Sequence, residues 1–273
     1  MSSKSSFPIL ELPNLALDHI LGCFSMEELA KLSKTSKRLK FFVRSFSYRH
    51  YQFELKLYIM PTVCTVYLRS LKNVGFQISY QNHRLGSLMN MDLKDLINRF
   101  LEIFKIVSST LGIQKSYLET LQVLGLLKEF GFKITEANLN PLESSGPSDS
   151  SEDIFYTRIL KESFQIPKLF IKFKPSPNFK LPRNFNFKFN NSMLELKSSK
   201  WITFHTLKKF FLEVDILMLD EVRMRKYEIV KFLKIWMTMD SETVQIRASE
   251  LDFIQILMAM DTVPINEVML SGV

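Results

Sequence analysis

The chain has 273 residues, of which 46% are hydrophobic, and a formal net charge of +8. A chain of this length and apolar content can bury one full core, and we expect two cores of unequal size. No apolar run approaches the roughly 20 residues of a membrane span, and the first residues lack the apolar stretch of a secretory signal. We therefore expect a globular protein of the cytoplasm, the nucleus or both, with no membrane partner.

The residues that hold metals or form disulfides are few and scattered. Cys23 and Cys64 lie far apart in the sequence, which provides neither a disulfide framework nor the paired cysteines of a zinc site. The histidines also lack metal-ligand spacing; they are His19, His50, His83 and His205. We expect no metal and no other cofactor.

The motifs of common enzyme classes are missing from the sequence. It contains no GxxxxGK[ST] phosphate loop, no GxGxxG and no GxSxG nucleophile turn. Adjacent acidic pairs such as Asp220 and Glu221 point their side chains apart, whereas general acid-base catalysis needs convergent groups. We expect no catalytic residues and no enzyme activity of the chain's own.

In chain order, residues 7–47 predict three short helices. Pro13 fits the first turn of a helix, where its missing N–H has no intrahelical partner. Ser25 and Glu28 form a capping box that begins a second helix, and a third begins near Thr35. The apolar positions of this small unit exceed what three short helices can bury among themselves, so we expect a partner to cover some of them.

Strands and two longer helices follow. Alternating apolar residues predict strands in FELKLYI (53–59), CTVYLRS (64–70) and GFQISYQ (75–81). Helical spacing predicts a helix over about 92–108, and a second that begins with a capping box of Ser116 and Glu119 and stops at Gly131. These elements are expected to pack the core.

Residues 140–154 are poor in apolar residues and rich in Ser, Pro and acidic residues, which predicts a disordered surface loop. Serines before acidic residues could also accept phosphate, whose added charge would change the partners of the loop.

Most of the positive charge lies in residues 161–190, which contain seven basic residues and one acidic residue. Phe185, Phe187 and Phe189 alternate with Asn186 and Lys188, which predicts a strand with phenylalanines in the core and lysines in solvent. Ile171 and Phe173 alternate with lysines in the same way. The alternative is a single-stranded nucleic-acid site, in which lysines bind phosphates and phenylalanines stack on bases.

The last eighty residues show a rough internal repeat. Strand-like segments lie around Leu196, Leu219 and Ile246, separated by helical patterns such as that of residues 225–239. The strands recur at intervals of 23 and 27 residues, which is the scale of a leucine-rich repeat. In such a repeat, each strand-helix unit buries its apolar face against the next. We expect an α/β sheet of irregular, leucine-rich-repeat-like units.

The first helices resemble an F-box. The resemblance covers residues 7–47 and rests on apolar and basic positions in a fixed order: Leu12-Pro13, Leu15, Ile20-Leu21, Glu28-Leu29, Leu32-Ser33 and Lys37-Arg38. It is similar to the variant found in the large nematode F-box families. The segments LKIWM and TVQIRA are similar to the F-box associated type-2 domain of those proteins. Many F-boxes carry a Cys-Arg-x-Trp step where this chain has SKTSKRLK, without tryptophan.

The resemblance implies an α+β or α/β fold, with a three-helix F-box at residues 1–50 and a larger α/β domain at 51–273. It also implies a substrate-recognition subunit of an SCF-type ubiquitin ligase. The F-box would bind a Skp-family adaptor and through it a cullin, and the α/β domain would bind an unidentified target protein. Such a subunit needs no catalytic residue because it works by proximity.

The residues assigned to the F-box core and its adaptor-facing surface are Leu12, Pro13, Leu15, Ile20, Leu21, Leu29 and Leu32. The sequence does not divide these two roles, and a three-helix unit packed on its own α/β domain would have the same apolar stripes. The alternative function is a non-catalytic module that binds nucleic acid or protein through the basic, phenylalanine-rich tract 164–190.

Overall fold

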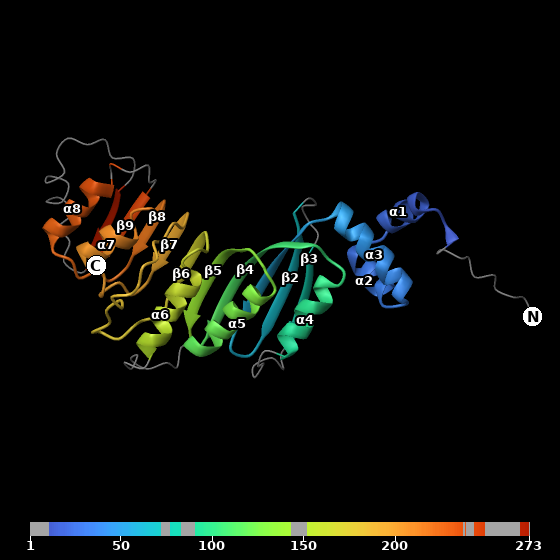
Figure 1. Cartoon of the computed structure of the whole chain (residues 1–273), viewed down its shortest axis with the longest axis horizontal. Helices are drawn as coiled ribbons and strands as arrows, with labels where there is room; N and C mark the ends of the chain where they lie inside the picture. The colour runs from blue at the N-terminus through green and yellow to red at the C-terminus, as the bar shows by residue number, and fades with distance from the viewer. Residues whose placement is uncertain are drawn as a thin grey trace, which may run out of the picture.

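The structure, a computed structural model, describes residues 11–71, 77–82, 91–142, 152–236, 238, 243–248 and 268–272. Three helices come first and a mixed α/β domain follows. The helices are α1 (Asn14–Gly22), α2 (Met26–Ser33) and α3 (Lys37–His50). They lie at one end of an elongated molecule, and α7 and α8 lie at the other end (Figure 1). No helix in the described ranges has the length and apolar character to cross a membrane.

The described strands form a single ten-stranded sheet in the order β10-β9-β8-β7-β6-β5-β4-β1-β2-β3. The bounds are β1 (Phe53–Ile59), β2 (Cys64–Ser70), β3 (Gln77–Asn82), β4 (Ile106–Lys115), β5 (Ile134–Pro141), β6 (Lys168–Ile171), β7 (Met193–Leu196), β8 (Ile216–Leu219), β9 (Thr243–Ala248) and β10 (Val268–Gly272). The first three strands pair antiparallel. The strand β4 pairs in parallel with β1, and from β5 onward each strand lies parallel beside the strand before it in the sequence.

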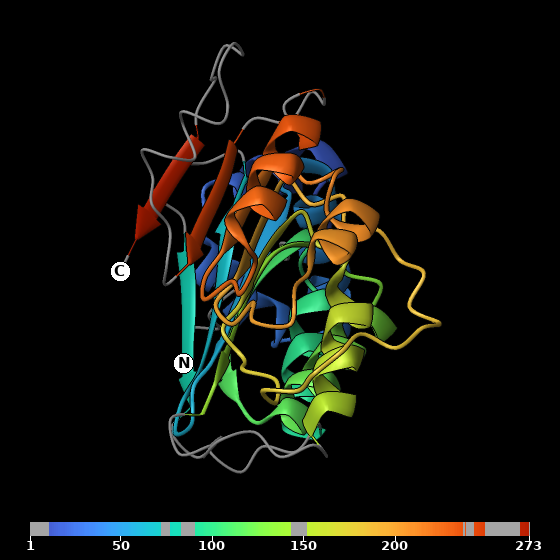
Figure 2. The same cartoon turned by 90° about the vertical axis from the view of Figure 1, so that its left-hand side faces the viewer.

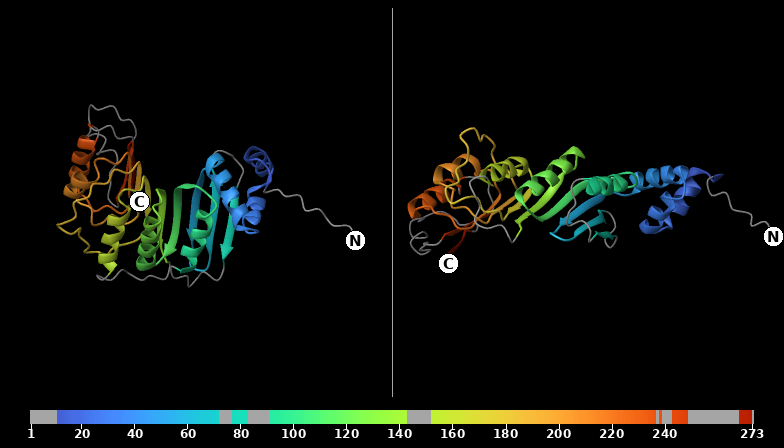
Figure 3. Two further views of the ribbon diagram at one scale, coloured as in Figure 1. Left: turned by 45° about the vertical axis from the view of Figure 1, so that its right-hand side comes forward. Right: turned by 90° about the horizontal axis from the view of Figure 1, so that it is seen from below.

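The helices of the α/β domain cover one face of this sheet, as the views along its length and from below show (Figures 2 and 3). They are α4 (Met91–Leu101), α5 (Tyr117–Glu129), α6 (Glu152–Ser163), α7 (Phe204–Phe210) and α8 (Lys226–Trp236). In β1, Leu55 and Leu57 are buried, whereas Lys56 and Tyr58 are half-buried or exposed. Successive strand residues point to opposite faces, so the buried set lies under the helices and the polar set on the open face.

The ends of α5 are as predicted. The Ser116 hydroxyl accepts a hydrogen bond from the Glu119 N–H at 3.3 Å, and the Ser116 N–H donates to the Glu119 carboxylate at 3.1 Å. Gly131, just beyond the helix, has φ +69°, the left-handed region that glycine enters without a steric penalty. The predicted capping box is confirmed.

The helix predicted over 92–108 is wrong in its second half. The helix α4 ends at Leu101, and Val107 lies in β4, which pairs in parallel with β1 from Ile106 onward. The apolar residues after α4 matched a helical period by chance. In the sheet, Ile106 pairs with Phe53 and Ser108 pairs with Glu54, and Val107 is the extra residue at the register shift between these two pairs.

The predicted strand at 185–189 is also wrong. Residues 172–192 form an irregular connection between β6 and β7, although Phe185 and Phe189 are buried and Lys188 is exposed as expected. Three prolines, which cannot donate to a strand ladder, interrupt this connection at 175, 177 and 182. The Phe189 N–H donates to the Phe210 carbonyl at the end of α7 rather than to a strand.

The predicted loop 140–154 is shorter at both ends, because β5 extends to Pro141 and α6 begins at Glu152. Residues 143–151 lie outside the described residues, as do residues 75–76 of the third predicted strand and Met239 of the last predicted helix.

The three strands predicted in the last eighty residues are β7, β8 and β9. Leu196 pairs with Leu219, and Leu219 pairs with Ile246, so the recurring apolar positions are direct neighbours across the sheet. All three side chains are buried.

Replacing Phe189 with alanine is expected to lower the free energy of unfolding by about 3–5 kcal/mol, because a large side chain leaves a cavity. Phe189 is 0% exposed, and its ring stacks on Phe211 with 4.9 Å between the ring centroids. Urea unfolding measures the change. The exposed Asn186, replaced with alanine, is the control, with an expected change within about 0.5 kcal/mol. Equal effects of the two changes would place Phe189 outside the core.

Replacing Ser116 with alanine is expected to cost about 1 kcal/mol of stability at pH 7. Burial raises the pKa of Glu119, but hydrogen bonds from Ser116 and the nearby Lys115 ammonium together hold the pKa below its ordinary value. A lowered pKa in the folded state contributes stability that is lost as the pH falls through that pKa. The difference between wild type and variant should therefore shrink in acid. Gln122→Ala, in the same helix, is the control and should show no such pH dependence.

Candidate functional site

The described residues give no sign of a catalytic or metal centre. No group of three or more His, Cys, Asp or Glu side chains within these ranges could hold a metal ion. Burial raises the pKa of the Cys64 thiol to about 11, so the thiol stays protonated and is a poor nucleophile at neutral pH. The candidate sites described below are surfaces.

Local chemistry shapes the first three helices. The Ser25 hydroxyl accepts from the Glu28 N–H at 3.3 Å, and the Ser25 N–H donates to the Glu28 carboxylate at 2.7 Å. These bonds complete the predicted capping box of α2 and hold the pKa of Glu28 below its ordinary value. The Ser36 hydroxyl accepts from the Leu39 N–H at 3.1 Å and caps α3. The helices α2 and α3 thus begin where a side chain satisfies a free backbone donor, whereas α1 begins after Pro13 without a side-chain cap.

The structure separates the seven residues assigned to these helices. Leu21 and Leu29 are buried in the core beside Val43 and Phe46. Three of the seven are half-buried: Leu12, Ile20 and Leu32. The remaining two, Pro13 and Leu15, are exposed, and Leu15 shows 72% of its surface to solvent. The exposed leucine has no packing role, which makes it available to a partner.

Leu15 borders a surface pocket of about 620 Å³ between α1 and α3. The pocket is lined by Leu15, Asp18, His19, Gly22, Cys23, Phe46, His50 and Tyr51. An ion pair of 2.8 Å between Asp18 and Arg49 joins α1 to α3 beside it. We call this pocket with Leu15 the α1–α3 surface.

The F-box domain family model matches residues 9–51. This range contains α1, α2 and α3 entirely, so the F-box accounts for the helical end of the molecule. The comparisons with curated proteins and with solved structures found no match. The nematode variant and the F-box associated type-2 domain stay predictions.

Sequence reasoning missed the contribution of α3 to the α1–α3 surface. Phe46 and His50 are one helical turn apart, with 4.7 Å between their ring centroids, and both line the same pocket as Leu15. The spacing of four residues was visible in the sequence, but which face of α3 meets α1 was not.

Aromatic rings join the F-box to the α/β domain. The ring centroids of Phe46 and Tyr51 are 5.9 Å apart, those of Tyr51 and Phe53 are 6.1 Å apart, and those of Phe53 and Phe104 are 5.1 Å apart. The large cluster of buried side chains accordingly includes F-box residues and sheet residues together. The expectation of two separate cores is wrong, because these rings bridge the helices and the sheet.

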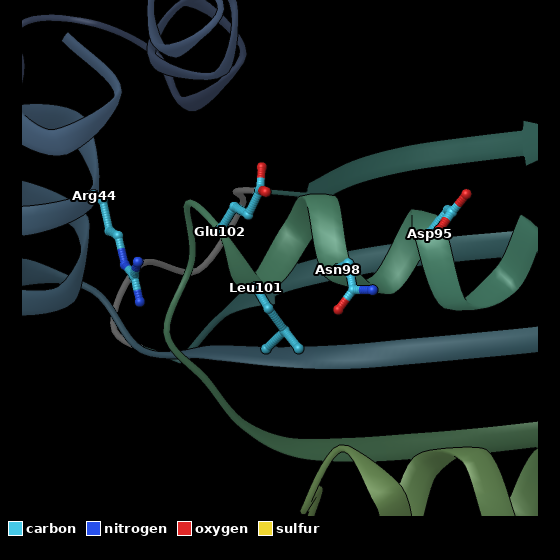
Figure 4. A pocket seen from close by; sticks show the side chains of 5 residues that line it. All are labelled: Arg44, Asp95, Asn98, Leu101 and Glu102. Atoms are coloured by element: carbon cyan, nitrogen blue, oxygen red, sulfur yellow. The ribbon is translucent and has the colours of Figure 1, made fainter. Parts of the chain in front are cut away.

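Polar contacts between α3 and α4 strengthen this joint. Lys40 forms an ion pair with Glu102, and the Tyr48 hydroxyl donates to the Leu101 carbonyl at 3.0 Å. A pocket of about 460 Å³ lies between the two helices. Its lining consists of Arg44, Asp95, Asn98, Leu101 and Glu102 (Figure 4). Arg44 extends from the F-box toward the end of α4, whereas Asp95 lies farther along α4, so the charged groups do not converge as a catalytic pair would (Figure 4).

Replacing Tyr51 with alanine should loosen this joint, because it removes the middle ring of the aromatic bridge. We expect trypsin to cleave after Arg49 about tenfold faster, since cleavage requires local opening of the segment. Limited proteolysis followed by mass spectrometry measures the rate at that site. Tyr227→Ala, at an exposed tyrosine of α8, is the control and should leave the rate unchanged. An unchanged rate in Tyr51→Ala would show that the polar contacts suffice.

Proposed function

We propose that this protein is a non-catalytic substrate-recognition subunit of an SCF-type ubiquitin ligase. The observation that carries the proposal is the F-box match on helices that leave the α1–α3 surface open. F-box domains typically bind Skp-family adaptors within such ligases. The adaptor would connect the chain to a cullin, and the α/β domain would hold the target protein.

The α1–α3 surface has the chemistry of a protein interface. An exposed leucine beside an apolar pocket, with aromatic and histidine rings in its lining, can supply the desolvated contacts that dominate binding energy. Phe41 on α3 is also 67% exposed, and Pro13 precedes α1 at the surface. In this proposal, Leu21 and Leu29 maintain the fold, while Leu12, Pro13, Leu15, Ile20 and Leu32 contribute to the adaptor-facing side.

The α/β domain suits a role in presenting a bound protein. We propose that its successive strand-helix units are irregular leucine-rich-repeat-like units, supported by the parallel order from β4 to β9 and by the paired positions Leu196, Leu219 and Ile246. The open face of such a sheet offers an extended binding surface. A firm joint to the F-box would hold the target at a set orientation, and proximity then promotes ubiquitin transfer.

The buried phenylalanines of residues 164–190 weigh against the nucleic-acid alternative. Phe185 packs edge-on against Phe210, with 5.5 Å between the ring centroids, and Phe189 stacks on Phe211. Bases need an exposed ring face to stack on, and these faces are occupied by protein. Lys188 is paired with Glu213 at 2.6 Å, which further reduces the charge open to a phosphate backbone.

Co-purification with a Skp-family protein tests the proposal. Leu15→Glu should reduce adaptor binding at least tenfold, because it places a charge in an interface that must desolvate. Leu118→Glu is the matched control, since Leu118 is also an exposed leucine near the start of a helix, with 51% of its surface exposed, but lies outside the F-box. This control should bind as well as wild type.

Two outcomes would contradict the adaptor role. One is a wild-type chain that binds no Skp-family protein, and the other is equal loss of binding in Leu15→Glu and Leu118→Glu. Circular dichroism on both variants separates loss of the interface from loss of the fold. A further double change, Leu12→Ala with Pro13→Ala, tests the entry to α1 in the same assay.

A further inference from the structure

The connection after β6 departs from the architecture of the rest of the domain. A helix follows each of β4, β5, β7 and β8, whereas residues 172–192 after β6 contain no helix or strand. Connections longer than about 12–15 residues without secondary structure are uncommon in compact domains and usually have a function. This one is anchored by buried Phe179, Phe185 and Phe189, so its backbone is held in place.

The anchored connection and α7 enclose a surface pocket of about 790 Å³, which we call the α7 pocket. Its floor is aromatic, formed by Phe179, Trp201 and Phe210, each at most 8% exposed. The loop after β6 supplies one wall, and the loop after β7 together with α7 supplies the other. The pocket therefore combines a rigid apolar base with walls from two adjacent units.

The rim of the α7 pocket is positively charged. Its charged lining residues are all basic, and they are Lys180, Arg183, Lys200 and Lys209. Lys200 has a partner, Glu221, at 3.3 Å. Within the described part of the chain, no carboxylate lies within ion-pair distance of Lys180 or Arg183. Clustered like charges repel each other, and a ligand with negative charge relieves that repulsion.

We propose that the α7 pocket binds an acidic segment of the target protein, a deduction that rests on the function proposed above. Carboxylates of the segment pair with Lys180, Arg183 and Lys209 at the rim. One apolar side chain of the segment covers the aromatic floor between them. The α7 pocket thus selects targets by a short stretch of Asp and Glu residues around an apolar residue.

The geometry of the floor favours a peptide over a nucleic acid. Phe179 and Trp201 meet edge to face, with 5.3 Å between the ring centroids and 86° between the planes. The Trp201 N–H donates to the Ser198 carbonyl at 3.1 Å, which holds the indole in the floor. Rings locked in this way present little open face to a base.

The position of the α7 pocket suits target presentation. The strand β7 lies four places from β1 in the sheet, which is about 19 Å at roughly 4.8 Å per strand. The F-box adjoins β1 through Tyr51 and Phe53. A bound segment would therefore lie toward the end of the molecule opposite the F-box (Figure 1).

Peptide binding to the full-length chain tests this proposal. The probe is an array of 12-residue peptides that carry four Asp or Glu residues around a central leucine, beside matched peptides with Asn and Gln in their place. Wild type should prefer the acidic peptides, and its affinity should fall as salt rises. The double change Lys180→Glu with Lys209→Glu should reduce binding of the best acidic peptide at least tenfold.

A matched control keeps the total charge change the same. Lys174→Glu with Lys208→Glu alters one exposed lysine of the same connection and one of α7, neither of which lines the α7 pocket. It should change affinity less than twofold. Equal loss in the two double variants, or no preference for acidic peptides in wild type, would overturn the proposal. Tighter binding of single-stranded oligonucleotide, lost in the Lys180 and Lys209 variant, would also overturn it.

The assay is independent of the F-box. Leu15→Glu should bind the acidic peptide as well as wild type, because Leu15 and the α7 pocket are at opposite ends of the molecule. If the chain binds the peptide through Lys180 and Lys209 but binds no Skp-family protein, the proposed site for acidic peptides stands and the ligase role is refuted. A chain that binds the adaptor without preference for acidic peptides would refute the site alone.

Discussion

Alternate residues along β1, β6, β7 and β8 and along most of β4 are buried, and the helices α4 to α8 cover one face of the sheet. This one-sided cover organises the molecule. A parallel sheet needs its apolar face covered between successive strands, which a helix normally does. After β6 the cover comes instead from Phe185 and Phe189, which pack on Phe210 and Phe211 of the neighbouring unit. The same burial holds the walls of the α7 pocket.

The F-box depends on the same core. Its third helix continues through Tyr51 directly into β1, and the rings from Phe46 to Phe104 join the two parts without a flexible linker. The α1–α3 surface and the α7 pocket therefore sit at opposite ends of one packed body. In the proposed role, which is to hold two proteins near each other, a firm connection matters more than any reactive side chain.

The two wrong predictions of secondary structure have related causes. Apolar spacing around 92–108 fitted a helix, but the chain from Ile106 onward is in β4, where Ile106 and Ser108 pair in parallel with β1. Alternation at 185–189 fitted a strand, and the phenylalanines are indeed buried, yet the backbone found its partner in α7 rather than in the sheet. Periodicity indicates which side chains are buried, but it does not indicate which groups form hydrogen bonds with the backbone of the segment.

Local chemistry was enough to predict the caps at Ser25 and Ser116, the strand pattern of β1 and β2, the repeating strands around Leu196, Leu219 and Ile246, and the resemblance of the first helices to an F-box. These features depend on residues near one another in the chain. Only the fold showed that Leu15 is exposed whereas Leu21 is buried. Only the fold brought Lys180, Arg183 and Lys209 together around one aromatic floor. Both features depend on contacts between segments far apart in sequence, which no local pattern encodes.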